Sequence, residues 1–299
     1  MEKDLKRILI IQTAFLGDVV LATPLVEALH RHYPQAEIDF VLKKGNESLL
    51  KGHPHLRQVL VFDKARGKIK NLLQLLGKIR GNRYELVINL HRFASSGIMS
   101  AFSGAPDRRG FDKNPLSVFY THSLAHQIGG AHPLHETERN LQLIGDIAPE
   151  DKRRPVLYPT PADYRQVQPL QQQGPYLCIA PTSVWFTKQF PEEKWVALLR
   201  QLPRHLHIYL IGGPADAEIC QRIARQGGHP LSQNLAGQLS LLQSAALMQQ
   251  ALLNYVNDSG PMHLASAVNG NTCAIFCSTV PAFGFGPRAV GPGKRYGHG

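Results

Sequence analysis

Several polar side chains in the second half of this 299-residue chain directly follow apolar runs. The stretch VNDSGPMHLASAVNG (256–270) places Asp258, Ser259 and Gly260 between such a run and a predicted helix whose first turn carries His263. The first turn of a helix offers free N–H groups and the positive end of the helix dipole, and both attract anions. The stretch therefore predicts an anion site, although simple packing in the core explains His263 equally well.

Two more loops in this half carry groups suited to phosphate. APTSVWFTKQFPEEKW supplies the hydroxyls of Thr182 and Ser183 and the cation of Lys188, and LIGGPADAE supplies Gly212 and Gly213, which let backbone approach a ligand closely. All three loops follow strands of one predicted sheet, so they should meet at one edge of it. Together they predict a diphosphate site. The sequence contains no G-x-x-x-x-G-K-[ST], which excludes a P-loop nucleotidase.

Near the N-terminus, TAFLGDVVLATP follows the first predicted strand and brings Gly17 and Asp18 to a helix start. A dinucleotide-binding domain would show G-x-G-x-x-G here, so the single glycine argues against a nicotinamide or flavin enzyme. On spacing alone, a helix cap is the favoured role for Asp18. A catalytic role is compatible with capping.

The elements that must position these residues alternate along the chain. Near-continuous apolar strands separated by helices indicate parallel sheets covered on both faces, so we expect a doubly wound α/β fold. A Pro- and Gln-rich stretch at 149–175 predicts a linker with one short helix. We expect strands at 7–12, 37–42, 58–62, 85–90, 176–180, 207–213, 252–257 and 272–276, and helices at 18–33, 192–201, 215–226, 240–250 and 262–268.

The net charge of the chain limits the classes of partner that it could bind, but it does not identify one of them. The chain has 33 Lys and Arg against 22 Asp and Glu, a net charge of +11, which fits nucleic acid, an anionic membrane surface or a phosphorylated substrate. Residues 64–83 carry seven basic side chains and no acidic one, interleaved with leucines. An ordinary amphipathic helix is favoured, with attraction to a phosphorylated lipid acceptor or an anionic membrane as the alternative. Nucleic acid ranks last because no interleaved aromatics or known module accompany the charge.

Other compositional features point to a cytoplasmic protein. The first twelve residues lack a secretory signal and no apolar run approaches the length of a membrane span. Cys273 and Cys277 have a spacing that could serve a metal, but TCAIFCST is typical of a buried strand and no second pair completes a site. We therefore expect reduced thiols and no bound metal.

Four motifs resemble the glycosyltransferase family that contains the lipopolysaccharide heptosyltransferases. They are RILIIQTAFLGDVVLATPLVEALHRHYP, KQFPEEKW, NDSGPMHLASAV and AIFCSTVPAFGFGP, and they span most of the chain. The resemblance implies a GT-B fold, in which two Rossmann-like doubly wound domains face a central cleft. It implies an acceptor-binding domain at 1–155 and a nucleotide-sugar domain at 156–299. It also implies inverting transfer of a heptose from ADP-heptose to a lipopolysaccharide core or related glycan, without metal or cofactor.

The resemblance also assigns roles to residues. It makes Asp18 the catalytic base, with Gly17 beside it on the acceptor side. Independently of the resemblance, the charges of Arg108 and Arg109 in GAPDRRGF would add to the basic surface of residues 64–83 for an acceptor. The resemblance makes Lys188 a ligand of the donor diphosphate. The full set of expected donor-binding residues is Thr182, Ser183, Lys188, Gly212, Gly213, Asp258, Ser259, Gly260, Met262, His263 and Thr279.

The chain departs from the family pattern in two places. FCST stands where the family has F-G-x-T, so Cys277 replaces a glycine, and the sequence ends at GPGKRYGHG without the usual further helices. We therefore expect a C-terminal domain that is shortened. Two alternatives stay open: a nucleotide-sugar epimerase or hydrolase of similar build, and a nucleotide-sugar-binding protein with impaired catalysis.

Overall fold

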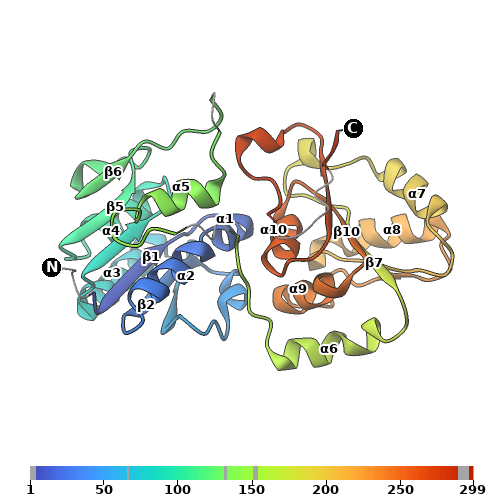
Figure 1. The fold of residues 1–299 in the computed structure, drawn as a ribbon, viewed down its shortest axis with the longest axis horizontal. Coiled ribbons are helices and arrows are strands. Elements are labelled where there is room, and N and C mark those ends of the chain that lie inside the picture. Colours follow the sequence, from blue (N-terminus) through green and yellow to red (C-terminus); the bar gives the residue numbers. More distant parts are fainter. Residues whose placement is uncertain (1–4, 66, 131–132, 151–153, 289–295, 299) are drawn as a thin grey trace. The chain divides into compact units, whose positions relative to one another are not determined.

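A computed structural model describes residues 5–65, 67–130, 133–150, 154–288 and 296–298 of the protein (Figure 1). Its contacts divide the chain into two compact units, Met1–Arg153 and Arg154–Gly299. Each unit is built around one six-stranded parallel sheet. The boundary predicted after residue 155 lies two residues further along the chain.

The sheet of the first unit has the strand order β3-β2-β1-β4-β5-β6, and every pairing is parallel. Residues of β1 alternate between its two faces, and Ile8, Leu9, Ile10 and Ile11 are all fully buried, so helices must cover both faces. The strands are β1 (Arg7–Ile11), β2 (Glu37–Lys43), β3 (Gln58–Phe62), β4 (Leu86–Asn89), β5 (Asp107–Phe111) and β6 (His122–Leu124). The helices are α1 (Leu16–Leu21), α2 (Thr23–His32), α3 (Lys68–Asn82), α4 (Ala94–Ala101) and α5 (Glu136–Gln142), with short 3-10 turns at Glu47–Leu50 and Ser117–Phe119.

The helix that we expected over 18–33 is two helices, α1 and α2, separated at Ala22. Pro24 is the cause. It has no N–H to continue the hydrogen-bond ladder, and its ring would clash with the preceding turn, but it fits the first turn of a new helix. The consequence is that Asp18 belongs to a separate six-residue helix directly after β1.

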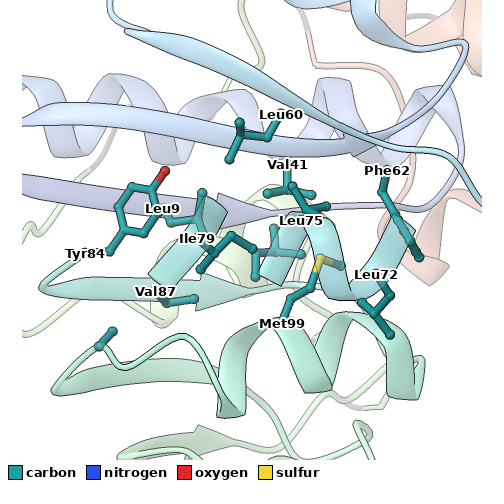
Figure 2. Close-up of a cluster of buried hydrophobic side chains, with 12 residues drawn as sticks. Leu9, Val41, Leu60, Phe62, Leu72, Leu75, Ile79, Tyr84, Val87 and Met99 are labelled. Atoms are coloured by element: carbon teal, nitrogen blue, oxygen red, sulfur yellow. The ribbon is translucent and has the colours of Figure 1, made fainter. Parts of the chain in front are cut away.

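A cluster of apolar side chains fixes α3 on one face of this sheet (Figure 2). Leu72, Leu75 and Ile79 of α3 are buried at helical spacing, and they pack against strand residues that include Leu9 and Val87. This inner stripe uses one side of α3. The other side is left to solvent.

The second unit repeats the topology, with the order β12-β11-β10-β7-β8-β9 and parallel pairing throughout. Its strands are β7 (Tyr176–Ala180), β8 (His207–Leu210), β9 (Ser232–Asn234), β10 (Leu253–Asn257), β11 (Thr272–Phe276) and β12 (Tyr296–His298). Its helices are α6 (Pro161–Gln171), α7 (Glu192–Gln201), α8 (Ala217–Gly227), α9 (Leu241–Gln250) and α10 (Gly260–Ala267), with 3-10 turns at Phe186–Lys188, Pro214–Asp216 and Pro281–Phe283. The fully buried Trp195 of α7 lies at the centre of its core, beside Ile179 and Ile208.

The predicted linker contains α6, which belongs to the second unit. Thr160 caps this helix by accepting a hydrogen bond from the N–H of Asp163, and the Asp163 carboxylate accepts one from the N–H of Thr160 at 2.8 Å. Tyr164 donates a 2.7 Å hydrogen bond to Gln249, which ties α6 to α9.

Two glycines in the first unit should respond in opposite ways to an added methyl group. Gly77 lies inside α3, and a Cβ added there would have nothing within 4 Å, whereas a Cβ on Gly110 would lie 2.5 Å from the Tyr120 ring and 2.8 Å from the Asn89 carbonyl oxygen. We expect Gly77→Ala to raise the free energy of unfolding by about 0.5–1 kcal/mol, because alanine favours helix and restricts the unfolded chain. Gly110→Ala should lower it by about 1–3 kcal/mol through overpacking. Urea denaturation of both variants measures the two shifts, and an equal response would contradict the packing described.

Candidate active site

Strand order locates the place where each sheet can bind a ligand. In open parallel sheets, ligands bind beyond the carboxyl ends of the strands, at the point where the order of strands reverses. That point lies between β1 and β4 in the first unit and between β7 and β10 in the second. The loops after these four strands carry Asp18, His91, Lys188 and Asp258.

At the switch point of the second unit, three predicted donor-binding residues form one hydrogen-bonded group. The Lys188 ammonium donates to the Asp258 carboxylate at 2.6 Å, and the Thr279 hydroxyl donates to the same oxygen, also at 2.6 Å. Asp258 is only 4% exposed, so these two hydrogen bonds stand where water would otherwise contact its carboxylate. The loops after β7, β10 and β11 are thereby joined around one buried carboxylate. Cys277, which stands where the family has glycine, is exposed and leaves Thr279 in place.

The side chain of Asn257 holds the loop between β7 and α7. Its amide group donates to the Pro181 carbonyl oxygen at 2.8 Å, and its own oxygen accepts from the Phe190 N–H at 3.0 Å. Within the loop, Gln189 donates to the Ser183 carbonyl oxygen at 2.7 Å. Sequence reasoning did not single out Asn257, although it directly precedes Asp258 at the end of a predicted strand.

Helix α10 begins at the predicted residue Gly260, with Ser259 at its N-cap position. The Ser259 hydroxyl lies 3.5 Å from the Thr182 carbonyl oxygen, so this helix start adjoins the loop after β7. No side chain caps the helix. Pro261 has no N–H and the Met262 N–H donates to the Ser259 carbonyl oxygen at 3.1 Å, so the N–H groups suited to a ligand are those of Ser259 and Gly260.

His263 and Met262 lie inside the unit. Both are buried, and burial lowers the pKa of His263 to about 4, with the Asp258 charge opposing and the Lys188 charge adding to the shift. His263 is therefore neutral near pH 7. Its Nδ1 atom has no hydrogen-bond partner among the described residues. Met262 is fully buried, which is typical of a core residue.

Gly212 and Gly213 follow β8, the strand next to β7. The Asp216 carboxylate accepts a hydrogen bond from the Gly213 N–H at 2.7 Å, and a Cβ on Gly212 would lie 2.8 Å from the Asp216 side chain. The glycine at 212 is thus required by the adjoining turn as well as being suited to close approach by a ligand.

In the first unit, Asp18 occupies the first turn of α1, and its carboxylate accepts a hydrogen bond from the Phe15 N–H at 3.1 Å. The capping role is therefore present. Desolvation, followed by the charge of Glu136, raises the pKa of Asp18, while the Phe15 hydrogen bond and the charge of Lys113 oppose the shift. A carboxylate whose pKa is raised is a better proton acceptor than an ordinary aspartate. Gly17 directly precedes it in the same turn.

Glu136 and Lys113 set the electrostatic surroundings of Asp18. Burial opposes ionisation of Glu136, but the hydrogen bond from His126 and the charges of His126, Arg139 and Lys113 outweigh it and lower the pKa of Glu136 to about 2. Glu136 is thus a permanent anion. Desolvation lowers the pKa of Lys113 to about 8, although the charges of Glu136 and Asp18 oppose that shift. Asp18 therefore lies in a field of fixed charges of both signs.

Four basic residues gather around His91 at the carboxyl edge of the same sheet. Desolvation and, to a smaller extent, the charges of four basic side chains together lower the pKa of His91 to about 4. We call them the basic edge group: Lys43, Lys64, Arg92 and Lys113. The neutral His91 ring shares a 2.8 Å hydrogen bond with the Thr13 hydroxyl, and Lys64 donates to the Thr13 carbonyl oxygen at 2.8 Å. Sequence reasoning missed this group, although three members end or closely follow strands that it predicted.

The structure does not bring Arg108 and Arg109 to this edge. Arg109 is 2% exposed within β5, and its guanidinium contacts the carboxylates of Asp107 and Asp146, each at 3.0 Å. Arg108 donates to the carbonyl oxygens of Phe119, at 2.9 Å, and Ala105. These contacts give both arginines a structural role. The basic edge group is better placed for the acceptor contact that we expected of them.

Metal sites and membrane spans can both be assessed over the described part of the chain. Among these residues, no group of three or more His, Cys, Asp or Glu side chains is arranged to hold a metal ion. Within the same ranges, each helix falls short of the length or the hydropathy needed to cross a bilayer.

Two doubly wound units with loops of this kind at their switch points are the build of the GT-B fold. The model of glycosyltransferase family 9 (heptosyltransferase) matches residues 72–289, and the chain belongs to that family. The predicted fold class and enzyme class are confirmed. The chain is 28% identical over 281 residues to lipopolysaccharide heptosyltransferase 3 of Escherichia coli, covering 89% of this chain and 82% of that protein.

Solved structures agree on the fold. A glycosyltransferase family 9 protein from Veillonella parvula superposes with a TM-score of 0.84 at 23% identity, covering 96% of this chain and 84% of that one. The E. coli ADP-heptose LPS heptosyltransferase II superposes with a TM-score of 0.80 at 23% identity, covering 97% and 92%.

Proposed function

We propose that this glycosyltransferase moves a heptose from ADP-heptose to a lipopolysaccharide core or a closely related glycan, with inversion at the anomeric carbon. The observation that carries the proposal is the group formed by Lys188, Asp258 and Thr279 at the switch point of the second unit. A cation beside an uncapped helix start is suited to a diphosphate. The names of the relatives supply the sugar and the acceptor class.

In the proposed reaction, Asp18 accepts the proton of an acceptor hydroxyl while that oxygen attacks the anomeric carbon. The bond from this carbon to the diphosphate breaks, and its electron pair leaves with the diphosphate. Lys188 and the N–H groups at the start of α10 stabilise the negative charge that grows there, a contribution of about 3–4 kcal/mol for one donor in comparable sites. These groups need no metal or cofactor to supply the charge stabilisation.

The proposed acceptor is phosphorylated and linked to lipid. The basic edge group supports this part, because its cations lie at the sheet edge that carries Asp18, one of them, Lys113, acts on the Asp18 charge, and together they would attract an anionic acceptor. A lipid-linked acceptor also implies contact between the enzyme and an anionic membrane surface. We propose no nucleic-acid partner.

A binding screen should identify the donor class. We expect ADP to raise the melting temperature and AMP to raise it much less, because the second phosphate is the group that Lys188 would contact. At a concentration of 100 Kd, a ligand adds about 2.7 kcal/mol to the free energy of unfolding. The melting-temperature shifts with UDP and GDP test which nucleobase the site prefers. Equal shifts with AMP and ADP would contradict a diphosphate site.

Transfer itself is tested by mass spectrometry of a heptose-deficient lipopolysaccharide acceptor incubated with enzyme and ADP-heptose. One added heptose per acceptor supports the proposal. Free heptose or an epimerised donor in the absence of acceptor would instead indicate a hydrolase or an epimerase. Binding of ADP-heptose without turnover on any acceptor would indicate impaired catalysis.

A further inference from the structure

Helix α3 has an outer face that the fold of the first unit does not use. Leu72, Leu75 and Ile79 point into the core (Figure 2). On the other side, Ile69 is 73% exposed and Leu73 is 61% exposed. These two aliphatic side chains lie four residues apart and are therefore neighbours on the helix surface. An exposed aliphatic pair gains nothing from the fold, so a surface that removes it from water would bind it favourably.

The charge around this pair has one sign. From residue 64 to residue 83 the sequence contains seven basic residues and no acidic one. Four of them lie on α3 itself, each exposed: Lys68, Lys70, Lys78 and Arg80. An exposed apolar pair flanked by lysines and arginines is the pattern of a helix that lies in the interface of an anionic bilayer, with its apolar side chains among the headgroups.

We infer that the outer face of α3, defined as Ile69, Lys70, Leu73 and Arg80, docks on an anionic lipid surface. Charge complementarity selects the lipid over a neutral surface. The aliphatic pair distinguishes it from a polyanion such as nucleic acid, which would be met by cations with interleaved aromatics. Lys70 and Arg80 supply the electrostatic attraction, and Ile69 and Leu73 are the side chains that insert.

The place of this face in the fold connects it to the proposed acceptor. Helix α3 follows β3, so its first two turns, which contain Ile69 and Leu73, start from the carboxyl edge of the sheet. Asp18 and the basic edge group lie at that same edge. Docking through these turns would hold the lipid surface beside the position of Asp18. Only this connection to the acceptor rests on the proposed function, because lipid binding itself can be measured without substrates.

The test is co-sedimentation of the full-length protein with vesicles of phosphatidylcholine alone or with added phosphatidylglycerol. We expect binding only when phosphatidylglycerol is present. Ile69→Ser/Leu73→Ser should lower the partition coefficient roughly tenfold or more, since each side chain would lose buried apolar area. Lys70→Gln/Arg80→Gln should lower it by about tenfold or more at low salt, because each cation near an anionic surface contributes about fivefold.

Control variants test whether vesicle binding depends on the outer face of α3 or only on the overall charge and exposed apolar area of the protein. Lys194→Gln/Arg225→Gln removes two charges from exposed positions of α7 and α8, and Leu252→Ser removes an exposed leucine, so both should bind vesicles like the wild type. Thermal melts confirm that each variant is folded. No binding to phosphatidylglycerol vesicles, or binding that Ile69→Ser/Leu73→Ser leaves unchanged, would overturn the inference. If transfer to lipopolysaccharide fails while vesicle binding depends on α3, the docking surface stands and only the proposed function falls.

Discussion

Asp18→Asn is expected to lower kcat by about 10²–10⁴-fold, the range associated with loss of a general base. Asparagine is nearly the same size, and its oxygen can still accept the hydrogen bond from the Phe15 N–H. The helix start should therefore survive while the proton acceptor is lost. Steady-state kinetics with ADP-heptose measure the rate, and ADP-induced thermal shifts verify that donor binding is unchanged.

The control for Asp18→Asn is a second capping aspartate. Asp163 accepts a hydrogen bond from the Thr160 N–H at the start of α6, as Asp18 does at α1. Asp163→Asn should leave kcat unchanged, so a loss confined to the Asp18 variant separates catalysis from capping. If both variants keep wild-type turnover, Asp18 is a cap and another group is the base.

The stability of the Asp18 variant has a predictable sign as well. The folded state raises the pKa of Asp18, so it binds the proton more tightly than the unfolded chain does. Stability associated with this group is therefore lost as pH rises from the ordinary aspartate pKa through the raised one. The neutral asparagine avoids that loss, and the variant should be at least as stable as the wild type at pH 7. Wild-type kcat should fall as pH drops through the raised pKa, because protonated Asp18 cannot accept a proton.

Lys188→Ala is expected to weaken ADP binding and to lower kcat/KM for the donor by about 10²–10³-fold. It removes the only side-chain cation that contacts Asp258 among the described residues. The neighbouring Lys194 is exposed on α7, and Lys194→Ala should leave both quantities unchanged. Isothermal titration with ADP and steady-state kinetics provide the measurements.

A second substitution distinguishes ligand binding from folding in the lysine variant. Removing Lys188 leaves the buried Asp258 carboxylate with the Thr279 hydroxyl, so stability should fall. Adding Asp258→Asn should recover much of that stability but none of the ADP affinity. Recovery of ADP binding in the double variant would mean that Lys188 only holds the fold.

The sequence predicted the buried central elements well, for reasons that differ from one to the next. Strand β11 has the predicted bounds, because TCAIF is a short apolar run. Helix α7 also has the predicted bounds, because Pro191 followed by the acidic Glu192 and Glu193 is typical of a helix start. Strand β5 was missed because its sequence, DRRGF, looks like a polar loop. Its buried Arg109 is neutralised by Asp146, 37 residues away, and no local pattern reveals such a pairing.

The candidate site also contains residues that the sequence could predict and residues that it could not. Residues beside strand ends, such as Lys188 and Asp258, could be predicted from position and from the family motifs. The basic edge group could not, because its members end or follow four different strands and meet only when the sheet order is known. The interaction of Asp18 with Glu136 likewise joins positions 118 residues apart along the chain.

The side chain of Asn257 has a consequence for how fast and how selectively a donor can bind. One amide both donates to Pro181 and accepts from Phe190, so it fastens the two ends of the loop that carries Thr182, Ser183 and Lys188. The entropy of closing that loop is therefore lost when the unit folds, not when the ligand arrives. A carboxylate at this position could not donate the hydrogen bond to Pro181, and an aliphatic side chain could neither donate that bond nor accept the one from Phe190. With Asn257 present, the donor meets a loop that is already held in place, and association is limited by encounter instead of by loop rearrangement.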